Sequence, residues 1–322
     1  MSLLEKVTVK IPASTANLGP GFDTLGMALS LYAWLEIKPA AQTTFHLYGD
    51  HLTGLPLDKS NLIYEVAQMV FDEAGVSVPE LEISMYSDIP LTRGLGSSAS
   101  AIVGALAGAN ALIGSPLSND KLLDMATLLE KHPDNVGASL FGGIITAAWD
   151  GQRVDYIRIE PHQDLQALVI VPDFQLSTSM ARNVVPDQFD KSDVVHNVSR
   201  VSLLVAALTS GRLDMIQRAM SDRIHQPYRA SLVPGMAEIL EHASDHGALG
   251  AALSGAGPTL LTLVDRHDTR KAELEQYLTG TMEQEGIHAT AMWLDPDMDG
   301  VVILADQDER PFLERIKGEV NA

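Results

Sequence analysis

Residues 90–100, which read PLTRGLGSSAS, place two glycines, three serines and one arginine in a short run. The alternating residues 81–85 before them are typical of a strand, and an uncharged helical pattern follows them. A Gly-rich loop between a strand and a helix presents backbone N–H groups to an anion, and the helix adds unpaired N–H donors and the positive end of its dipole. Gly94 and Gly96 allow the backbone close to a phosphate, and Arg93 can add a cation. The stretch therefore indicates a phosphate-binding loop.

The two serines at the expected start of the helix, Ser97 and Ser98, have two interpretations. A hydroxyl there can cap the helix, as in an ordinary turn, or it can contact a metal ion bound to phosphate. The loop lacks the lysine of a Walker A motif. Its Gly-x-Gly-x-x-Ala pattern matches the dinucleotide fingerprint, but that fingerprint needs an acidic residue about 20 positions further on. A proline and the polar start of a helix stand there instead, so a dinucleotide site is not expected.

The elements around this loop differ between the two halves of the chain. In the first half, residues 61–70 have a helical pattern that Ser60 can cap and Gly75 can end, and a second helix is expected at 122–129. After Gly151 the pattern changes, and the elements predicted there are strands at 167–171, 248–253 and 259–264 and helices at 195–209, 213–225, 236–243 and 271–277. This change of pattern indicates two domains.

Composition excludes several classes of function. The 322-residue chain carries a formal net charge of −20, whereas a nucleic-acid-binding surface needs basic residues, so no nucleic-acid partner is expected. The chain contains no cysteine, which excludes disulfides and suits a reducing cytoplasm, and its N-terminus has no signal-peptide pattern. The uncharged segment 94–119 contains a Gly-xxx-Gly pair typical of membrane helices, but its serines and asparagine favour a buried helix rich in small residues. We therefore expect a cytoplasmic protein without a membrane partner.

Two further stretches, KIPASTANLGPGFDTLGMAL at 10–29 and LSGAGPTLLTL at 253–263, accompany the glycine loop. With the loop and HPDN at 132–135, they stand in the order found in the GHMP kinases, a family of small-molecule kinases that this chain resembles over most of its length. The resemblance implies a two-domain α+β fold. Its N-terminal mixed α/β domain, resembling domain 2 of ribosomal protein S5, would span residues 1–160, and a C-terminal ferredoxin-like α+β domain would span residues 161–322.

The resemblance implies that residues 90–100 wrap the phosphates of ATP. The matched positions are Pro90, Leu91, Thr92, Arg93, Gly94, Leu95, Gly96, Ser97, Ser98, Ala99 and Ser100. The 253–263 motif is implied to approach this loop and to close the active site from the second domain. Asn61 resembles the family position near the adenine, although a residue at a helix start can instead pair with local backbone.

A magnesium site is also implied by the resemblance. In such kinases the serine matching Ser98 binds Mg²⁺ together with a glutamate, for which Glu130 is the candidate. Glu130 falls in the last turn of its predicted helix, where a negative charge is unfavourable unless a cation lies nearby. A solvated glutamate at a frayed helix end is the alternative interpretation.

Within the family, the match is closest to members that use ATP to phosphorylate L-homoserine to O-phospho-L-homoserine in threonine biosynthesis. The positions that match their amino-acid pocket are Asn17, Asp23, Asp134, Asn135, Thr178, Arg182 and Arg229. The two arginines suit a carboxylate, and either aspartate can accept a hydrogen bond from an ammonium. Taken singly, an arginine more often makes a surface ion pair, and Asp23 has the sequence context of a turn. Two alternatives stay open: a GHMP kinase for another small alcohol that bears a carboxylate, and a catalytically inactive nucleotide-binding homologue.

The resemblance assigns the catalytic positions to Ser98, Glu130 and Asn135. Several GHMP kinases place an aspartate base where Asn135 stands, and an amide does not take up a proton in the usual sense. We therefore expect the proton of the acceptor hydroxyl to pass to a phosphate oxygen, with Asp134 as an alternative base and His132 as a positioning residue. Family analogy also allows for a homodimer, whose interface no stretch of the sequence identifies.

Residues 295–300, DPDMDG, together with Asp306 resemble a calcium-binding loop of the EF-hand type. Such loops lie between helices, whereas the flanking residues 289–294 and 301–304 have strand-like patterns. A hairpin that joins these two runs is the favoured interpretation, and no calcium site is expected.

Overall fold

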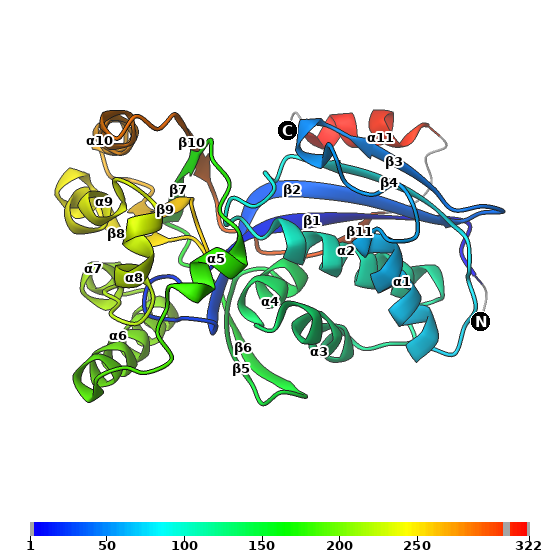
Figure 1. The fold of residues 1–322 in the computed structure, drawn as a ribbon, viewed down its shortest axis with the longest axis horizontal. Helices are drawn as coiled ribbons and strands as arrows, with labels where there is room; N and C mark the ends of the chain where they lie inside the picture. Colours follow the sequence, from blue (N-terminus) through cyan, green and yellow to red (C-terminus); the bar gives the residue numbers. More distant parts are fainter. Residues whose placement is uncertain (1–2, 305–309, 321–322) are drawn as a thin grey trace.

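The computed structural model describes residues 3–304 and 310–320. Its two lobes lie side by side, and each is built on one β-sheet covered by helices (Figure 1). This is the two-domain α+β arrangement that the sequence predicts. The predicted boundary near residue 160 falls between β6 (Val154–Ile159) and β7 (Leu165–Pro172), and its position stays a prediction.

The first sheet has the order β11-β1-β2-β4-β3, and β5 and β6 extend it from β2. Besides β6, its strands are β1 (Val7–Ala16), β2 (Leu25–Pro39), β3 (Thr44–Tyr48), β4 (Leu81–Ser87), β5 (Ile144–Trp149) and β11 (Val302–Leu304). One face is covered by α1 (Leu62–Glu73), α2 (Ser97–Leu112), α3 (Asn119–Glu130) and α4 (Asp134–Phe141) (Figure 1). On the other face, α11 (Phe312–Val320) packs Phe312 and Ile316 against the buried Trp34.

Small residues let α2 lie close to the first sheet. A Cβ on Gly104 would lie 2.9 Å from Cδ1 of Ile11, and one on Gly108 would lie 3.1 Å from Cδ1 of Ile37. Nearly the whole helix is buried, which confirms the prediction of a buried helix rich in small residues. Within the described residues, no helix combines the length and the apolarity that crossing a bilayer requires.

The second sheet has the order β10-β7-β9-β8, and each neighbouring pair is antiparallel. With β7, its strands are β8 (Ala248–Leu253), β9 (Leu260–Asp265) and β10 (Ala289–Leu294). This order is the ferredoxin-like one that the family resemblance implies. The helices of this lobe are α5 (Thr178–Asn183), α6 (Lys191–Ser210), α7 (Ile216–Ala219), α8 (Gln226–Arg229), α9 (Met236–His242) and α10 (Lys271–Gln284). Short 3₁₀ turns span Asp50–Leu52 in the first lobe and Leu213–Met215, Ala230–Leu232 and Ala243–His246 in the second.

The predicted hairpin of residues 289–294 with 301–304 is wrong. β10 pairs with β7 in the second sheet, whereas β11 pairs with β1 in the first sheet. The chain between them crosses from one lobe to the other, and the carboxylate of Asp297 accepts bonds there from Tyr32 and from the backbone of Gly300. Residues 295–300 therefore form a crossover and not a hairpin turn, and Asp306 lies outside the described residues.

Two local predictions also differ from the structure. The helix expected over 213–225 ends at Ala219, because the carboxylate of Asp222 accepts the backbone N–H groups of the next residues, Ile224, His225 and Gln226. The cap of α1 is Asn61 and not Ser60, whose hydroxyl instead donates to Asp58. In both places the side-chain oxygens of an aspartate or asparagine accept backbone N–H groups, and this determines where the helix begins or ends.

Candidate active site

The glycine loop runs from β4 to α2, as the sequence predicts. Gly96 has φ 70° and is the N-cap of α2, and Ser97 is its first helical residue. A Cβ on Gly94, which has φ 84°, would lie 2.4 Å from the carbonyl oxygen of Ser254, and a Cβ on Gly96 would lie 2.1 Å from Oγ of Ser14. The two glycines therefore allow the loop to pack against its protein neighbours as well as against any phosphate.

The second Gly-rich motif joins the loop to the other lobe. The hydroxyl of Ser254 donates to the carbonyl oxygen of Gly94 at 2.6 Å, and its Oγ lies 2.8 Å from the hydroxyl Oγ1 of Thr15. Nδ2 of Asn17 donates to the carbonyl oxygen of Gly255 at 2.9 Å. The prediction that the 253–263 motif approaches the glycine loop is confirmed.

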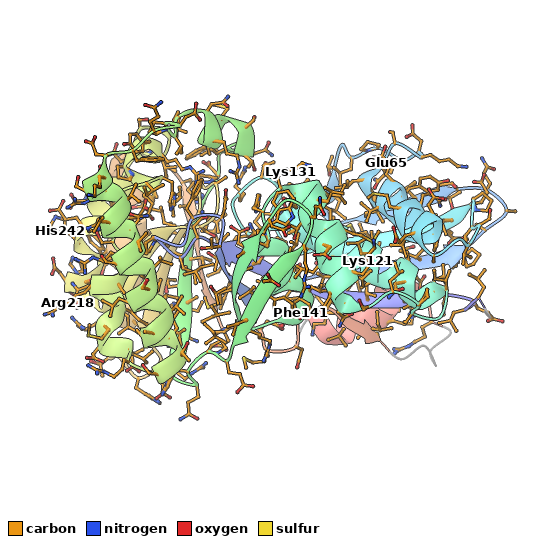
Figure 2. The ribbon with its side chains drawn as sticks, turned by 90° about the horizontal axis from the view of Figure 1, so that it is seen from below. Glu65, Lys121, Lys131, Phe141, Arg218 and His242 are labelled. Carbon is orange, nitrogen blue, oxygen red and sulfur yellow. The ribbon has the colours of Figure 1, made fainter. Side chains whose placement is uncertain are left out.

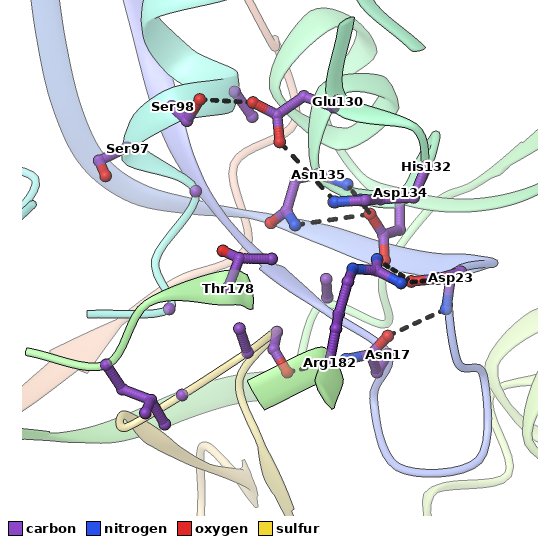
Figure 3. Close-up of a pocket in the computed structure, with 18 of the residues that line it drawn as sticks. Asn17, Asp23, Ser97, Ser98, Glu130, His132, Asp134, Asn135, Thr178 and Arg182 are labelled. Atoms are coloured by element: carbon purple, nitrogen blue, oxygen red, sulfur yellow. Dashed lines mark hydrogen bonds and ion pairs between the residues drawn. The ribbon is translucent and has the colours of Figure 1, made fainter. Parts of the chain in front are cut away.

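A pocket opens where these segments meet (Figure 3). It gathers most of the predicted site residues: Asn17, Asp23, Thr92, Gly94, Gly96, Ser97, Ser98, Ala99, Glu130, Asp134, Asn135, Thr178, Arg182 and Arg229. They come from segments far apart in the sequence and from both lobes. The glycine loop, two arginines and two aspartates line the same pocket, so it combines an anion-binding loop with charged groups of both signs.

The other predicted residues do not line this pocket. They are Asn61, Pro90, Leu91, Arg93, Leu95 and Ser100. Asn61 uses its side chain locally, because Oδ1 accepts from the N–H of Ile63 at 2.9 Å and Nδ2 donates to the carbonyl oxygen of Pro56 at 2.7 Å. Arg93 reaches across to the second lobe and donates to the carbonyl oxygen of Asp173 at 2.6 Å. The adenine contact of Asn61 stays a prediction.

Ser98 and Glu130 meet at the phosphate side of the pocket (Figure 3). Oγ of Ser98 donates to Oε1 of Glu130 at 2.5 Å. Glu130 is the last residue of α3, whose two ends are marked by Lys121 and Lys131 in Figure 2, and Lys131 closes the helix with φ 71°. A hydroxyl and a carboxylate are the hard oxygen donors that Mg²⁺ prefers, so this pair fits the implied metal.

His132 lies between the carboxylates of the pocket. Its Nδ1 lies 2.5 Å from Oδ1 of Asp134, and its Nε2 lies 3.7 Å from Oε2 of Glu130. Burial favours the neutral ring, but Asp134, Asp23 and Glu130 together outweigh it and raise the pKa of His132 to about 9. Asp23, His132 and Asp134 bring possible ligand atoms within 4.8 Å of one another. In the structure, Asp134 pairs with His132 and Asp23 pairs with Arg182, so each carboxylate of this cluster has a charged partner.

The free energy of unfolding is expected to fall as the pH rises from about 6.5 through 9. A folded-state pKa above the ordinary value means that the stabilisation is complete below pH 6.5 and is lost as the imidazolium deprotonates near pH 9. The shift corresponds to about 3 kcal/mol. Urea denaturation of the wild type and of His132→Gln between pH 6 and pH 10 measures it. The variant should lose this pH dependence, whereas His242→Gln, which alters a solvent-exposed histidine, should keep it; equal curves for all three proteins would refute the assignment.

Arg182 and Arg229 enter the pocket from the second lobe but have different partners. Arg182 makes a bidentate pair with Asp23, with Nη1 3.0 Å from Oδ2 and Nη2 2.8 Å from Oδ1. Arg229 is 2% exposed and donates to the carbonyl oxygens of Ala181 and Gly255, and burial together with the nearby Arg182 lowers its pKa to about 10. No carboxylate lies within ion-pair distance of Arg229 among the described residues. A buried guanidinium without a carboxylate partner suits an anionic ligand.

The sequence does not predict two features of the pocket. Phe22 stacks on the buried ring of His225 with centroids 5.0 Å apart, and Arg229 lies over the same Phe22 ring. His225 lies 2.8 Å from the carbonyl oxygen of Gly19 and 3.2 Å from Nη1 of Arg229. Phe22 belongs to the 10–29 motif, and His225 precedes Arg229 by four residues. In the sequence, only this closeness to predicted site residues indicates that Phe22 and His225 belong to the site.

Two family models match this chain. The GHMP kinases N terminal domain matches residues 61–143, and the GHMP kinases C terminal domain matches residues 204–282. Homoserine kinase from Deinococcus radiodurans is 44% identical over 92% of this chain and 96% of its own length. The chain belongs to the GHMP kinase family. Homoserine kinase from Moorella thermoacetica is 41% identical to this GHMP kinase over 92% of the chain and 99% of the relative.

Solved structures support the same family at the level of the fold. The structure of homoserine kinase from Cytophaga hutchinsonii matches this GHMP kinase with a TM-score of 0.84 and 27% identity, and the match covers 94% of this chain and 99% of that one. A mevalonate kinase structure, at 17% identity and a TM-score of 0.64, covers 91% of this chain and 99% of that one and shares the fold. Membership of this kinase family implies ATP as a substrate, and the two-domain GHMP kinase fold is confirmed.

Proposed function

We propose that this GHMP kinase transfers the γ-phosphoryl group of ATP to the side-chain hydroxyl of L-homoserine and releases O-phospho-L-homoserine. The observation that carries this proposal is the charge arrangement of the pocket. Arg182 and Arg229 lie with Asp23 and Asp134 in one pocket beside the glycine loop. Two guanidinium groups suit a carboxylate and two carboxylates suit an ammonium, so an amino acid with a hydroxyl directed at the loop fits the site.

The phosphate side would work by positioning and charge neutralisation. The loop N–H groups and the N-terminus of α2 favour the negative phosphates. Ser98 and Glu130 would hold Mg²⁺, which when bound neutralises phosphate charge. Because Ser98 lies in the first turn of α2 and Glu130 is the last residue of α3, two helix ends would keep the donor in place while the acceptor approaches.

On the acceptor side, Asn135 and one carboxylate oxygen of Asp134 already have partners within the protein. Oδ1 of Asn135 accepts from the hydroxyl of Ser14 at 3.0 Å, and its amide has no site for a proton. Oδ1 of Asp134 already accepts from His132 at 2.5 Å and from the N–H of Asn135 at 2.7 Å. Both observations support transfer of the hydroxyl proton to a phosphate oxygen, with Asn135 and Asp134 positioning the acceptor.

L-homoserine should release ADP at least about 100-fold faster than any other acceptor tested at equal concentration. Mevalonate and shikimate lack the ammonium and leave a carboxylate of the pocket unpaired, and L-serine is one methylene shorter, so its hydroxyl lies further from the phosphate. A coupled ADP-release assay with L-homoserine, L-serine, mevalonate and shikimate measures this preference. Faster release with mevalonate or shikimate would favour a GHMP kinase for another alcohol. ATP binding without ADP release for any acceptor would favour an inactive nucleotide-binding homologue.

The other assignments stay with this proposal. The product, O-phospho-L-homoserine, would be consumed in threonine biosynthesis. A homodimer and a cytoplasmic location follow from analogy with the family, and size-exclusion chromatography with light scattering would decide the oligomeric state.

A further inference from the structure

Asp23 and Arg182 form a bidentate ion pair across the acceptor side of the pocket (Figure 3). Asp23 follows β1 in the first lobe, and Arg182 lies in α5 of the second lobe. Both side chains are about one-third exposed, at 33% and 37%, so the pair faces the pocket and is not sealed in the core. The proposed function assigns these two groups to opposite ends of the acceptor. A ligand that uses both groups must therefore separate them from each other.

The contacts around the ion pair indicate which of its two residues is fixed in place. The backbone N–H of Asp23 donates to Oδ1 of Asn17 at 3.0 Å, and Asn17 is anchored in turn on Gly255. Asp23 is thus fixed at its backbone with φ 57°. The guanidinium of Arg182 has Asp23 as its bidentate partner and lies over the ring of Phe22, at 5.7 Å from the centroid. A long side chain over a flat ring can turn without disturbing the backbone, so Arg182 is the partner that is free to reorient.

The nearby charges make this exchange specific. Arg229 is held by two backbone carbonyls and lies within ion-pair distance of no carboxylate among the described residues. It can attract a carboxylate without giving up a partner, whereas Arg182 must first leave Asp23. Each arginine thus contributes differently to the recognition of the same carboxylate.

We propose that Asp23 and Arg182 act as an exchangeable ion pair that selects zwitterionic acceptors. The inference rests on the proposed function, because it concerns the same acceptor site. The carboxylate of the acceptor takes over the guanidinium of Arg182, and its ammonium takes over the carboxylate of Asp23. An acceptor with only a carboxylate can reach Arg182 only by breaking the same pair, which leaves Asp23 without a counter-ion, so it binds poorly even where its contact with Arg229 is good.

Asp23→Asn should therefore improve the binding of a ligand that lacks the ammonium. The probe is 4-hydroxybutyrate, which is L-homoserine without its amino group. Its dissociation constant, measured by ligand-observed NMR titration, should fall roughly two- to fivefold in the variant, because Arg182 no longer has to leave a bidentate partner. The dissociation constant of L-homoserine should rise at least about tenfold, because its ammonium loses a carboxylate. Asparagine tolerates a positive φ, so the turn should keep its shape.

The same substitution made in the Arg182→Gln variant distinguishes exchange of the ion pair from simple removal of the negative charge of Asp23. In Arg182→Gln, adding Asp23→Asn should leave the 4-hydroxybutyrate constant within about twofold, because no guanidinium is left to release. An equal gain in both backgrounds would show that the charge of Asp23 alone repels the ligand, and this would overturn the exchange. No gain in the wild-type background would overturn it as well.

A matched control is available on the surface. Arg212 and Asp214 form a bidentate pair that is exposed and outside the pocket, so Asp214→Asn should change neither constant. Turnover of L-homoserine by the wild type is measured in parallel. If the wild type phosphorylates L-homoserine but Asp23→Asn shows no gain, the exchange fails and the function stands. If the wild type does not phosphorylate it, the proposed function itself fails.

Discussion

Replacing Glu130 with glutamine is expected to lower kcat for L-homoserine phosphorylation roughly 10²- to 10³-fold, because a charged oxygen donor is lost next to the phosphates. Glutamine keeps the size and one carbonyl oxygen, so the contact with Ser98 can remain while the negative charge disappears. The Mg²⁺ concentration that gives half-maximal rate should rise for the same reason. ADP release measured across a Mg²⁺ titration tests both effects.

Glu73→Gln provides the matched control. Glu73 is also the last residue of a helix, α1, and it pairs with Lys121 at 2.8 Å on the surface. Its replacement removes a glutamate charge from an equivalent helix end and should leave kcat within about twofold. If Glu130→Gln kept more than a tenth of the wild-type kcat, or if both variants lost the same activity, Glu130 would not hold the metal.

The Gly94→Ala variant should lose stability and activity together. The new Cβ would lie 2.4 Å from the carbonyl oxygen of Ser254 and 3.0 Å from that of Gly257, so the glycine loop and the second Gly-rich motif must separate. Backbone strain at φ 84° adds to this clash. We expect the free energy of unfolding to fall by about 2–4 kcal/mol. Because the loop itself moves, kcat/KM should fall at least tenfold, by roughly 1.4 kcal/mol or more of transition-state stabilisation.

Gly114→Ala separates strain from the clash. Gly114 has φ 87°, and no neighbouring atom lies within 4 Å of the position that an alanine methyl group would take, so alanine there meets only the unfavourable φ. Its cost should be about 1 kcal/mol, with kcat/KM unchanged. Urea denaturation and the ADP-release assay on both variants give the comparison. Equal losses of stability would mean that the contact between Gly94 and Ser254 is not what requires glycine.

The residues that line the pocket come from both lobes, so the contacts between the lobes set their geometry. The first lobe supplies the phosphate loop, Glu130 and Asp134, and the second supplies Arg182 and Arg229. Contacts such as Ser254 to Gly94 and Asn17 to Gly255 hold the lobes together at the pocket itself. Substitutions at these contacts should therefore affect catalysis beyond their effect on stability.

Local chemistry can be read directly from the sequence. The pattern predicts the strand, glycine loop and helix around residues 81–112 in the correct order, because glycine content and periodicity act within a few residues. It also predicts Glu130 in the last turn of its helix, and Glu130 is the last residue of α3. The 253–263 motif is expected at the loop only through the family resemblance, since nothing within that motif specifies a partner 160 residues away.

Long-range pairing, in contrast, depends on the folded chain. Two neighbouring strand-like runs predict a hairpin, yet β10 and β11 join different sheets, because a strand pattern describes which face is buried and not which edge it meets. The same holds for charge: the pKa of His132 and the pairing of Asp23 with Arg182 arise from groups that only folding brings together. The sequence alone thus predicts most of the helices and strands, the glycine loop and the family. The lobe contacts, the direction of each arginine and the electrostatics of the pocket follow from distances in space, which no local pattern encodes.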